Sequence, residues 1–106
     1  MSQKTGKKVI WSVSARDELK QIYDYIKKDS QDQAKRVKSS IIKEAQNISH
    51  FPEKFEKERF LEGMEQEFRS RTIWNYKIVY ELRVDSIVIL KVFHTSQSIE
   101  NLRQNL

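Results

Sequence analysis

Three β-rich stretches near the C-terminal end of the chain constrain its fold most strongly. From Tyr76 to Leu82, apolar and polar residues alternate, which is typical of a strand with one buried face. From Ser86 to Phe93, odd- and even-numbered positions alike are apolar apart from Lys91, which predicts a strand covered on both sides. A third strand is predicted from Glu67 to Ile73, and Arg83–Ser86 supplies the last hairpin turn. This half of the chain therefore predicts a meander of three antiparallel strands.

The N-terminal half predicts one strand and the start of a helix. Lys8 to Ser12 is a short β-rich run that suits an edge strand. Ser14-Ala15-Arg16-Asp17 follows as a capping pattern, so we expect Ser14 to open the helix. One apolar stripe then recurs at helical spacing: Ala15, Leu19, Ile22, Tyr23 and Ile26.

A second helix is predicted from about Gln31 to Ser49. The polar turn Lys27–Ser30 separates it from the first helix and can cap it, and Pro52 forbids its continuation. Its apolar stripe consists of Ala34, Val37, Ile41, Ala45 and Ile48. Because only a short turn joins the two helices, they should pack as an antiparallel hairpin.

The order of elements predicts an α+β fold, with the helical hairpin on one face of a twisted, mainly antiparallel sheet. With 106 residues, the chain predicts a single domain over 1–106. Residues 1–7 are expected to be flexible, and the tail after Gln97 is expected to be a short helix or flexible. Residues 53–66 read as a loop, which Phe55, Phe60 and Leu61 anchor.

Composition excludes several classes of site. There is no cysteine, so disulfides, thiolate nucleophiles and cysteine zinc sites are excluded, and the chain suits a reducing compartment. No run approaches the ~20 apolar residues of a membrane span, and no apolar segment of a signal peptide follows the charged first residues. We therefore expect a cytoplasmic protein that acts without membrane, metal or cofactor.

Charge is unevenly distributed along the chain, whose formal net charge is +5. Residues 53–67 hold six acidic and three basic residues, whereas residues 68–94 hold five basic and two acidic ones. The sheet is therefore the positive part of the molecule, which favours an acidic partner such as nucleic acid or an acidic protein segment.

The order of elements and four sequence segments together resemble the RelE/ParE superfamily of bacterial type II toxins. The segments are VIWSVSARDELKQIYDYI, FPEKF, FRSRTIWNYKIVYEL and ILKVFHTSQ, which span nearly the whole chain. The resemblance implies a toxin that is held inactive by a cognate antitoxin, which wraps the toxin with a helix and a strand. RelE-like members of the superfamily cleave messenger RNA on the ribosome, whereas ParE-like members inhibit DNA gyrase by binding.

For a RelE-like, metal-independent endoribonuclease, the resemblance implies a catalytic set of Arg69, Arg71, Lys77, His94 and Glu58. Cleavage without a metal requires a base for the 2′-hydroxyl, an acid for the leaving oxygen and cations for the phosphorane. Arginine suits the last role because its planar fork pairs with phosphate, and histidine or glutamate suits the first two. For target binding without cleavage, the surface residues are Arg69, Arg71, Lys77 and Lys91.

Each of these residues also has a structural interpretation. Lys77 and Arg83 can be solvated side chains, His94 can close the end of the core, and Glu58 lies in a stretch of mixed charge. Arg69 and Arg71 share one face of their strand, so the pair is expected to form an anion site. Tyr76 and Tyr80 share a face with Ile78 and are expected to pack in the core.

Departures from the RelE-like pattern favour the ParE branch. Lysine stands at position 77 where many cleaving members have arginine, and Gln97 lies where many relatives have arginine. No tyrosine follows His94. The two long helices and the Phe51-Pro52-Glu53 junction also resemble ParE-like members. Gyrase binding is therefore the favoured prediction, ribosome-dependent cleavage of messenger RNA is the alternative, and a relative without toxicity is a third interpretation.

Overall fold

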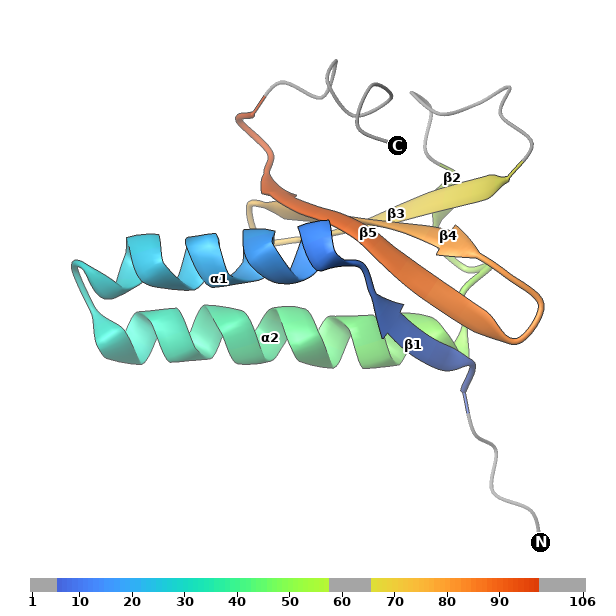
Figure 1. Ribbon diagram of the computed structural model, residues 1–106, viewed down its shortest axis with the longest axis horizontal. Coiled ribbons are helices and arrows are strands. Elements are labelled where there is room, and N and C mark those ends of the chain that lie inside the picture. The colour runs from blue at the N-terminus through green and yellow to red at the C-terminus, as the bar shows by residue number, and fades with distance from the viewer. Residues whose placement is uncertain (1–5, 58–65, 98–106) are drawn as a thin grey trace, which may run out of the picture.

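The computed structural model describes residues 6–57 and 66–97. Within these residues, two helices and five strands follow one another (Figure 1). They are β1 (Lys8–Trp11), α1 (Val13–Lys27), α2 (Gln31–His50), β2 (Glu56–Lys57), β3 (Glu67–Ile73), β4 (Tyr76–Leu82) and β5 (Ser86–His94). The predicted α+β order is confirmed, with one addition: the predicted loop contains the two-residue strand β2.

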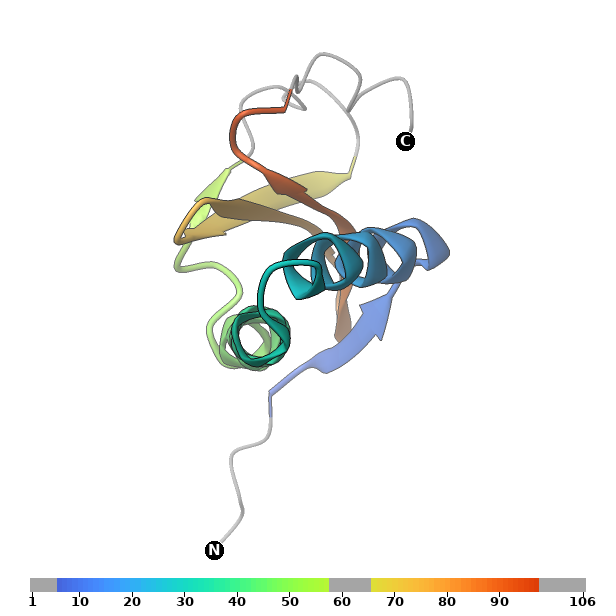
Figure 2. The same cartoon turned by 90° about the vertical axis from the view of Figure 1, so that its left-hand side faces the viewer.

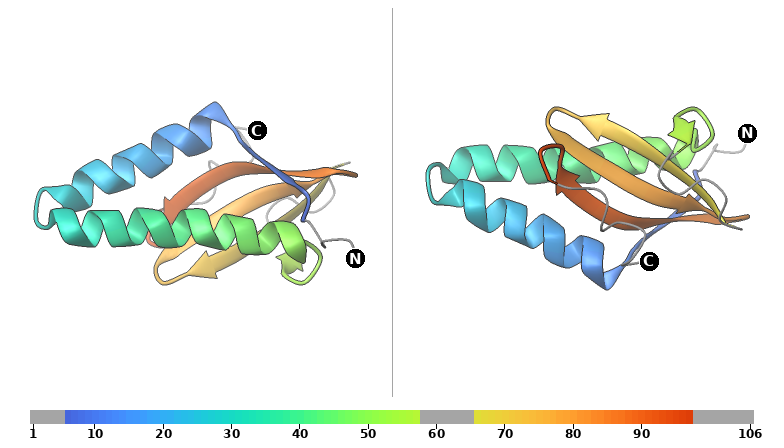
Figure 3. Two further views of the ribbon diagram at one scale, coloured as in Figure 1. Left: turned by 90° about the horizontal axis from the view of Figure 1, so that it is seen from below. Right: turned by 90° about the horizontal axis from the view of Figure 1, so that it is seen from above.

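The five strands form one mixed sheet in the order β1-β5-β4-β3-β2. β1 runs parallel to β5, and all other neighbours are antiparallel. Both helices lie on the same side of this sheet, as the end-on view in Figure 2 shows. Seen from below in Figure 3, α1 and α2 diverge from their short connection toward β1. The predicted meander and helical hairpin are therefore confirmed.

Each helix begins at a serine, but α1 begins earlier than predicted. The Ser12 hydroxyl accepts a hydrogen bond from the Ala15 N–H at 3.0 Å, so Ser12 and not Ser14 is the N-cap. The reason is that Ser12 keeps the extended backbone of β1, with φ of −66° and ψ of 160°, while Ser14 already lies in the first turn. Ser30 caps α2 in the same way, through the Gln33 N–H at 3.1 Å.

The core lies between the hairpin and the sheet. All five residues of the predicted α2 stripe are buried, and so are Ala15 and Leu19 of α1. The sheet contributes Ile78, Tyr80, Ile87, Ile89 and Val92, each at most 1% exposed. The prediction that Tyr80 and Ile78 face the core is confirmed, and Tyr76 packs against the same cluster.

A β-bulge in β5 changes which of its residues face the helices. Tyr80 pairs with Ile89 and Val79 pairs with Lys91, so Leu90 is the extra residue. Ile89 and Val92 therefore both belong to the core under the helices although they are three residues apart, whereas Leu90 packs with Phe68 and Val79 on the far face of the sheet. The alternation of strand residues predicted that His94 shares a face with Val88, Leu90 and Val92. Of these three, only Val92 belongs to the core under the helices.

Two shorter segments complete the described chain. The turn between β3 and β4 is confirmed at Trp74-Asn75, where Trp74 has a left-handed φ of 54°. The flexible stretch was expected to end at residue 7, yet the Lys7 N–H donates to the Ser49 carbonyl at 2.8 Å. Residues 1–5, the possible anchors Phe60 and Leu61, and the tail after Gln97 lie outside the described residues.

Within residues 6–57 and 66–97, no helix is both long and apolar enough to cross a membrane.

Candidate functional site

Arg69 on β3 is bound to a carboxylate and to a main-chain carbonyl. Its Nε donates to Oε2 of Glu67 at 2.7 Å, and its Nη2 lies 2.6 Å from the same oxygen. Its Nη1 donates to the Phe55 carbonyl at 2.7 Å. The side chain is only 14% exposed, so most of its donors already serve the fold.

Arg71, two residues further along the same strand, is bound to α2. Its Nε donates to Oε2 of Glu44 at 2.7 Å. The guanidinium carbon also lies 5.1 Å from the centroid of the Phe55 ring, within range of a cation–π interaction. Because the Glu44 side chain is 11% exposed, this pair lies partly out of water, where the attraction between its two charges is stronger than at the surface.

Together the two arginines hold the segment that leaves α2. Arg69 binds the Phe55 carbonyl, Arg71 lies over the Phe55 ring, and the Tyr80 hydroxyl donates to the Pro52 carbonyl. Burial raises the pKa of Tyr80 above its usual range, so this hydroxyl keeps its proton. The arginines do share one face, as predicted, but Glu67 and Glu44 occupy the place of the expected anion.

His94 lies on the other side of β4, at the edge of an open cavity of about 630 Å³. The cavity lies between α1 and the end of β5, and Ile22, Tyr25, Tyr76 and Gln97 also line it. The rings of Tyr76 and His94 meet edge to face, with centroids 5.4 Å apart and planes at 87°. Burial, followed by the proximity of Tyr25, raises the pKa of Tyr76. We call this cavity the His94 cleft.

Hydrogen bonds set the tautomer of His94. The Ser96 N–H donates to its Nδ1 at 3.1 Å, so Nδ1 is an acceptor. The neutral ring must then carry its proton on Nε2. The polar groups that line the cleft are the His94 imidazole, the tyrosine hydroxyls, the side-chain amide of Gln97 and the Glu18 carboxylate.

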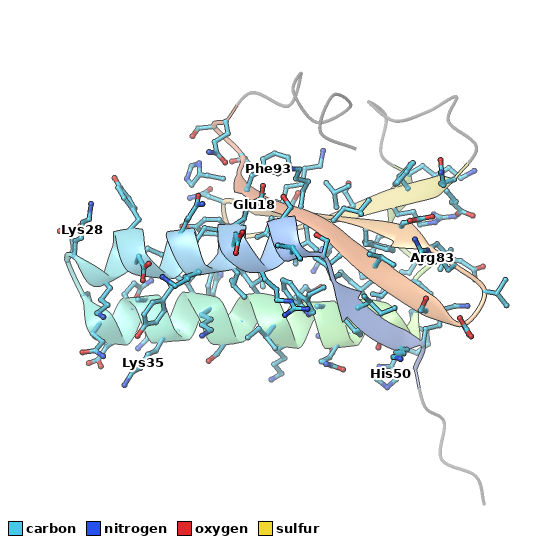
Figure 4. The ribbon with its side chains drawn as sticks, viewed as in Figure 1. Glu18, Lys28, Lys35, His50, Arg83 and Phe93 are labelled. Atoms are coloured by element: carbon cyan, nitrogen blue, oxygen red, sulfur yellow. The ribbon has the colours of Figure 1, made fainter. Side chains whose placement is uncertain are left out.

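Glu18 of α1 closes the edge of β5 beside this cleft. β1 pairs with β5 only as far as Ile89, and the Val92 N–H donates to Oε1 of Glu18 at 2.9 Å. Lys91 donates to Oε2 of Glu18 at 3.2 Å and to the Ser14 hydroxyl at 3.1 Å. Figure 4 shows Glu18 next to the end of β5, where Phe93 lies.

The residues of the predicted catalytic set are distributed over different parts of the sheet. Arg71 on β3 and His94 on β5 face the helices, with β4 between them, so at least about 10 Å separates the strands. Lys77 pairs with Phe93 and shares its face on the other side of the sheet. Lys91 is bound to Glu18, and Glu58 lies outside the described residues. The described members therefore do not form one cluster.

Two carboxylates with a role in this region were missed by sequence reasoning, and both carry a recognisable signal. Glu44 lies three residues after Ile41, and Glu18 lies three residues after Ala15, so each falls within an apolar stripe. A carboxylate at such a position requires a partner, because burial of an unpaired charge is costly. In the structure those partners are Arg71 and Lys91.

Within residues 6–57 and 66–97, no group of three or more histidine or acidic side chains could hold an ion.

Comparison with known proteins gives a consistent family and fold. Residues 9–99 match the family described as the ParE toxin of the type II toxin–antitoxin system parDE. A chromosomal ParDE system from P. aeruginosa superposes with a TM-score of 0.65 at 17% identity, covering 83% of this chain and 95% of that one.

The RelBE2 toxin–antitoxin complex from Mycobacterium tuberculosis gives a TM-score of 0.65 at 18% identity. That match covers 92% of this chain and 100% of the other. No match was found among curated protein sequences. At these identities the solved structures establish the RelE/ParE-like fold, and the family match extends over most of the sequence. The chain therefore belongs to the ParE toxin family of the parDE type II toxin–antitoxin systems.

Proposed function

We propose that this protein is the toxin of a type II toxin–antitoxin pair and that it stops growth by binding DNA gyrase in the cytoplasm. A cognate antitoxin neutralises it by covering its surface. In this function the protein acts as an inhibitor that binds and has no catalytic centre of its own.

The observation that supports binding over cleavage is the use of the two β3 arginines. Arg69 and Arg71 are bound to Glu67 and Glu44, and both hold Phe55. A phosphate would have to compete with Glu67 and the Phe55 carbonyl for Arg69, and with Glu44 for Arg71, before either arginine could stabilise a phosphorane. His94, on the far side of β4, would then act without a nearby guanidinium from β3.

The alternative is ribosome-dependent cleavage of messenger RNA, and the His94 cleft is the observation that favours it. His94 carries its proton on Nε2 and lines an open cavity with Tyr76 and Tyr25. In this tautomer the Nε2–H can donate a hydrogen bond to a phosphate oxygen, and the charged form of the ring can give its proton to the leaving oxygen.

Two assays on the purified, antitoxin-free chain separate these functions. One follows supercoiling of relaxed plasmid by gyrase, and the other follows integrity of messenger RNA in a reconstituted translation system. The proposal expects loss of supercoiling with intact RNA. RNA cleavage that requires ribosomes, with supercoiling unchanged, would overturn it.

A further inference from the structure

Most cations of the three-stranded meander β3–β5 are already paired with acidic side chains. Within 3.2 Å of a glutamate oxygen lie the charged groups of Arg69, Arg71, Arg83 and Lys91. The part of the chain that was predicted to attract an acidic partner is therefore largely balanced by its own carboxylates. Cations that are free to meet a polyanion must lie elsewhere.

Helix α2 carries such cations. Four exposed basic residues on it form no ion pair with any residue that the structure describes: Lys35, Arg36, Lys38 and Lys43. After Asp32 in its first turn, the helix holds a single carboxylate, Glu44, which is buried and bound to Arg71. Beyond Asp32, the exposed surface of α2 therefore carries positive charge and no carboxylate.

The four cations form two rows along the helix. Ser39 and Gln46 are exposed and lie close to the middle of the solvent side. At 3.6 residues per turn, Lys35 and Lys38 lie on one side of this middle line. Arg36 and Lys43 lie on the other side. Figure 4 shows Lys35 pointing away from the sheet. We call the surface formed by these six residues the α2 face.

We infer that the α2 face binds double-stranded DNA, an activity that goes beyond the proposed function, which needs contact with gyrase alone. The major groove of B-DNA is about 12 Å wide and admits an α-helix. The phosphates on its two sides would then lie next to the two rows of cations. Between the rows, the side chains of Ser39 and Gln46 can donate hydrogen bonds to phosphates or base edges. Because most contacts involve phosphate, the affinity should depend little on base sequence.

Other polyanions suit the α2 face less well. Single-stranded nucleic acid is held by aromatic side chains on which its bases stack, and α2 has no aromatic residue other than His50 at its end. Double-stranded RNA has a major groove that is too deep and narrow for side chains to read. An acidic protein would need apolar anchors, and Ile42 is the single apolar residue among the exposed positions of α2.

Fluorescence anisotropy of a labelled DNA duplex of about 20 base pairs tests the inference with the purified, antitoxin-free chain. Titrations at several salt concentrations give the slope of the logarithm of the association constant against the logarithm of the salt concentration. This slope reports how many phosphates the protein neutralises. RNA of the same sequence, in single-stranded and in double-stranded form, serves as the comparison.

The inference predicts saturable binding to the DNA duplex that weakens steeply with salt. Lys35→Gln and Lys43→Gln should each weaken binding roughly three- to tenfold at about 50 mM salt and lower the slope by about one, because each removes one phosphate contact. Lys20→Gln is the matched control, since it changes the net charge equally but removes a lysine of α1 that is paired with Asp24. The control should bind within about twofold of the parent.

Three results would overturn the inference: no binding to the DNA duplex at low salt, an equal loss of affinity in Lys20→Gln, or binding to either RNA as tight as to DNA. Circular dichroism of each variant separates lost binding from lost folding. The binding assay contains no gyrase. Gyrase inhibition without DNA binding would therefore count against the α2 face alone, and DNA binding without gyrase inhibition would count against the proposed function alone.

Discussion

Arg71 and Glu44 join β3 to α2 by a hydrogen bond of 2.7 Å between residues that are 27 positions apart in the sequence. The same guanidinium lies over the Phe55 ring, so one side chain connects the sheet, the hairpin and the segment between them. A residue expected to meet an anionic partner is thus part of the tertiary structure.

Arg71→Ala should lower the free energy of unfolding by about 1–3 kcal/mol, because it leaves the partly buried Glu44 carboxylate without its cation. Urea denaturation followed by circular dichroism measures this change. Lys20→Ala is the control, since Lys20 pairs with Asp24 one turn along α1 and both side chains of that pair are at least half exposed. The control should cost less than about 0.5 kcal/mol. Equal costs would contradict the structural role of Arg71.

The two serines at the start of α1 provide a second test. Ser12→Ala should lower stability by about 1 kcal/mol, because it removes the acceptor for the Ala15 N–H and the hydroxyl that donates to the Leu90 carbonyl. Ser14→Ala removes only an acceptor for Lys91 and should cost less. Thermal unfolding of both variants compares the two losses of stability. A larger loss in Ser14→Ala would show that Ser14 is the N-cap, as the sequence predicted.

Gly6 is a third position with a defined consequence. A Cβ there would lie 2.6 Å from the Ser49 hydroxyl oxygen and 2.9 Å from its main-chain carbonyl. Because backbone cannot move aside easily, Gly6→Ala should cost about 1–3 kcal/mol. Val84→Ala, at a side chain that is 93% exposed, should be nearly silent in the same denaturation experiment. Unchanged stability in Gly6→Ala would show that the close contact between Gly6 and Ser49 of α2 does not contribute to stability.

Tyr76 predicts a dependence of stability on alkaline pH. Burial and Tyr25 raise its pKa above 10.0, so the folded protein resists deprotonation more than the unfolded chain does. The resulting stability is complete below the unfolded pKa and is lost as pH rises through the folded one. Unfolding free energies measured between about pH 8 and pH 11 should therefore fall, and less steeply in Tyr76→Phe. If the unfolding free energy fell equally steeply with pH in Tyr76→Phe, Tyr76 would not be the cause of the pH dependence.

The sequence was sufficient to predict every described helix and strand except β2, but not every contact between them. The apolar stripe of α2 and the turn at Trp74-Asn75 were predicted correctly, because each depends on local periodicity or turn chemistry. The prediction that Leu90 and Val92 share a face was wrong, because a bulge shifts the alternation by one residue and leaves no clear mark in an apolar run.

In the candidate site, too, the local features could be predicted from the sequence and the tertiary contacts could not. That Arg69 and Arg71 share a face follows from the period of a strand, so it could be predicted. Their partners, Glu67 and Glu44, could not be assigned in advance, since the second comes from a helix whose position against the sheet is a tertiary fact. The sequence therefore predicted where the positive charges of β3 lie, but not that carboxylates already pair with them.

The most direct test of the central claim is gyrase supercoiling in the presence of the wild-type chain and of His94→Ala, with messenger RNA integrity followed in parallel. The account predicts that both proteins inhibit supercoiling to a similar extent and that RNA stays intact on translating ribosomes. Normal supercoiling together with ribosome-dependent RNA cleavage by the wild type, abolished in His94→Ala, would contradict it and would make the His94 cleft an active site.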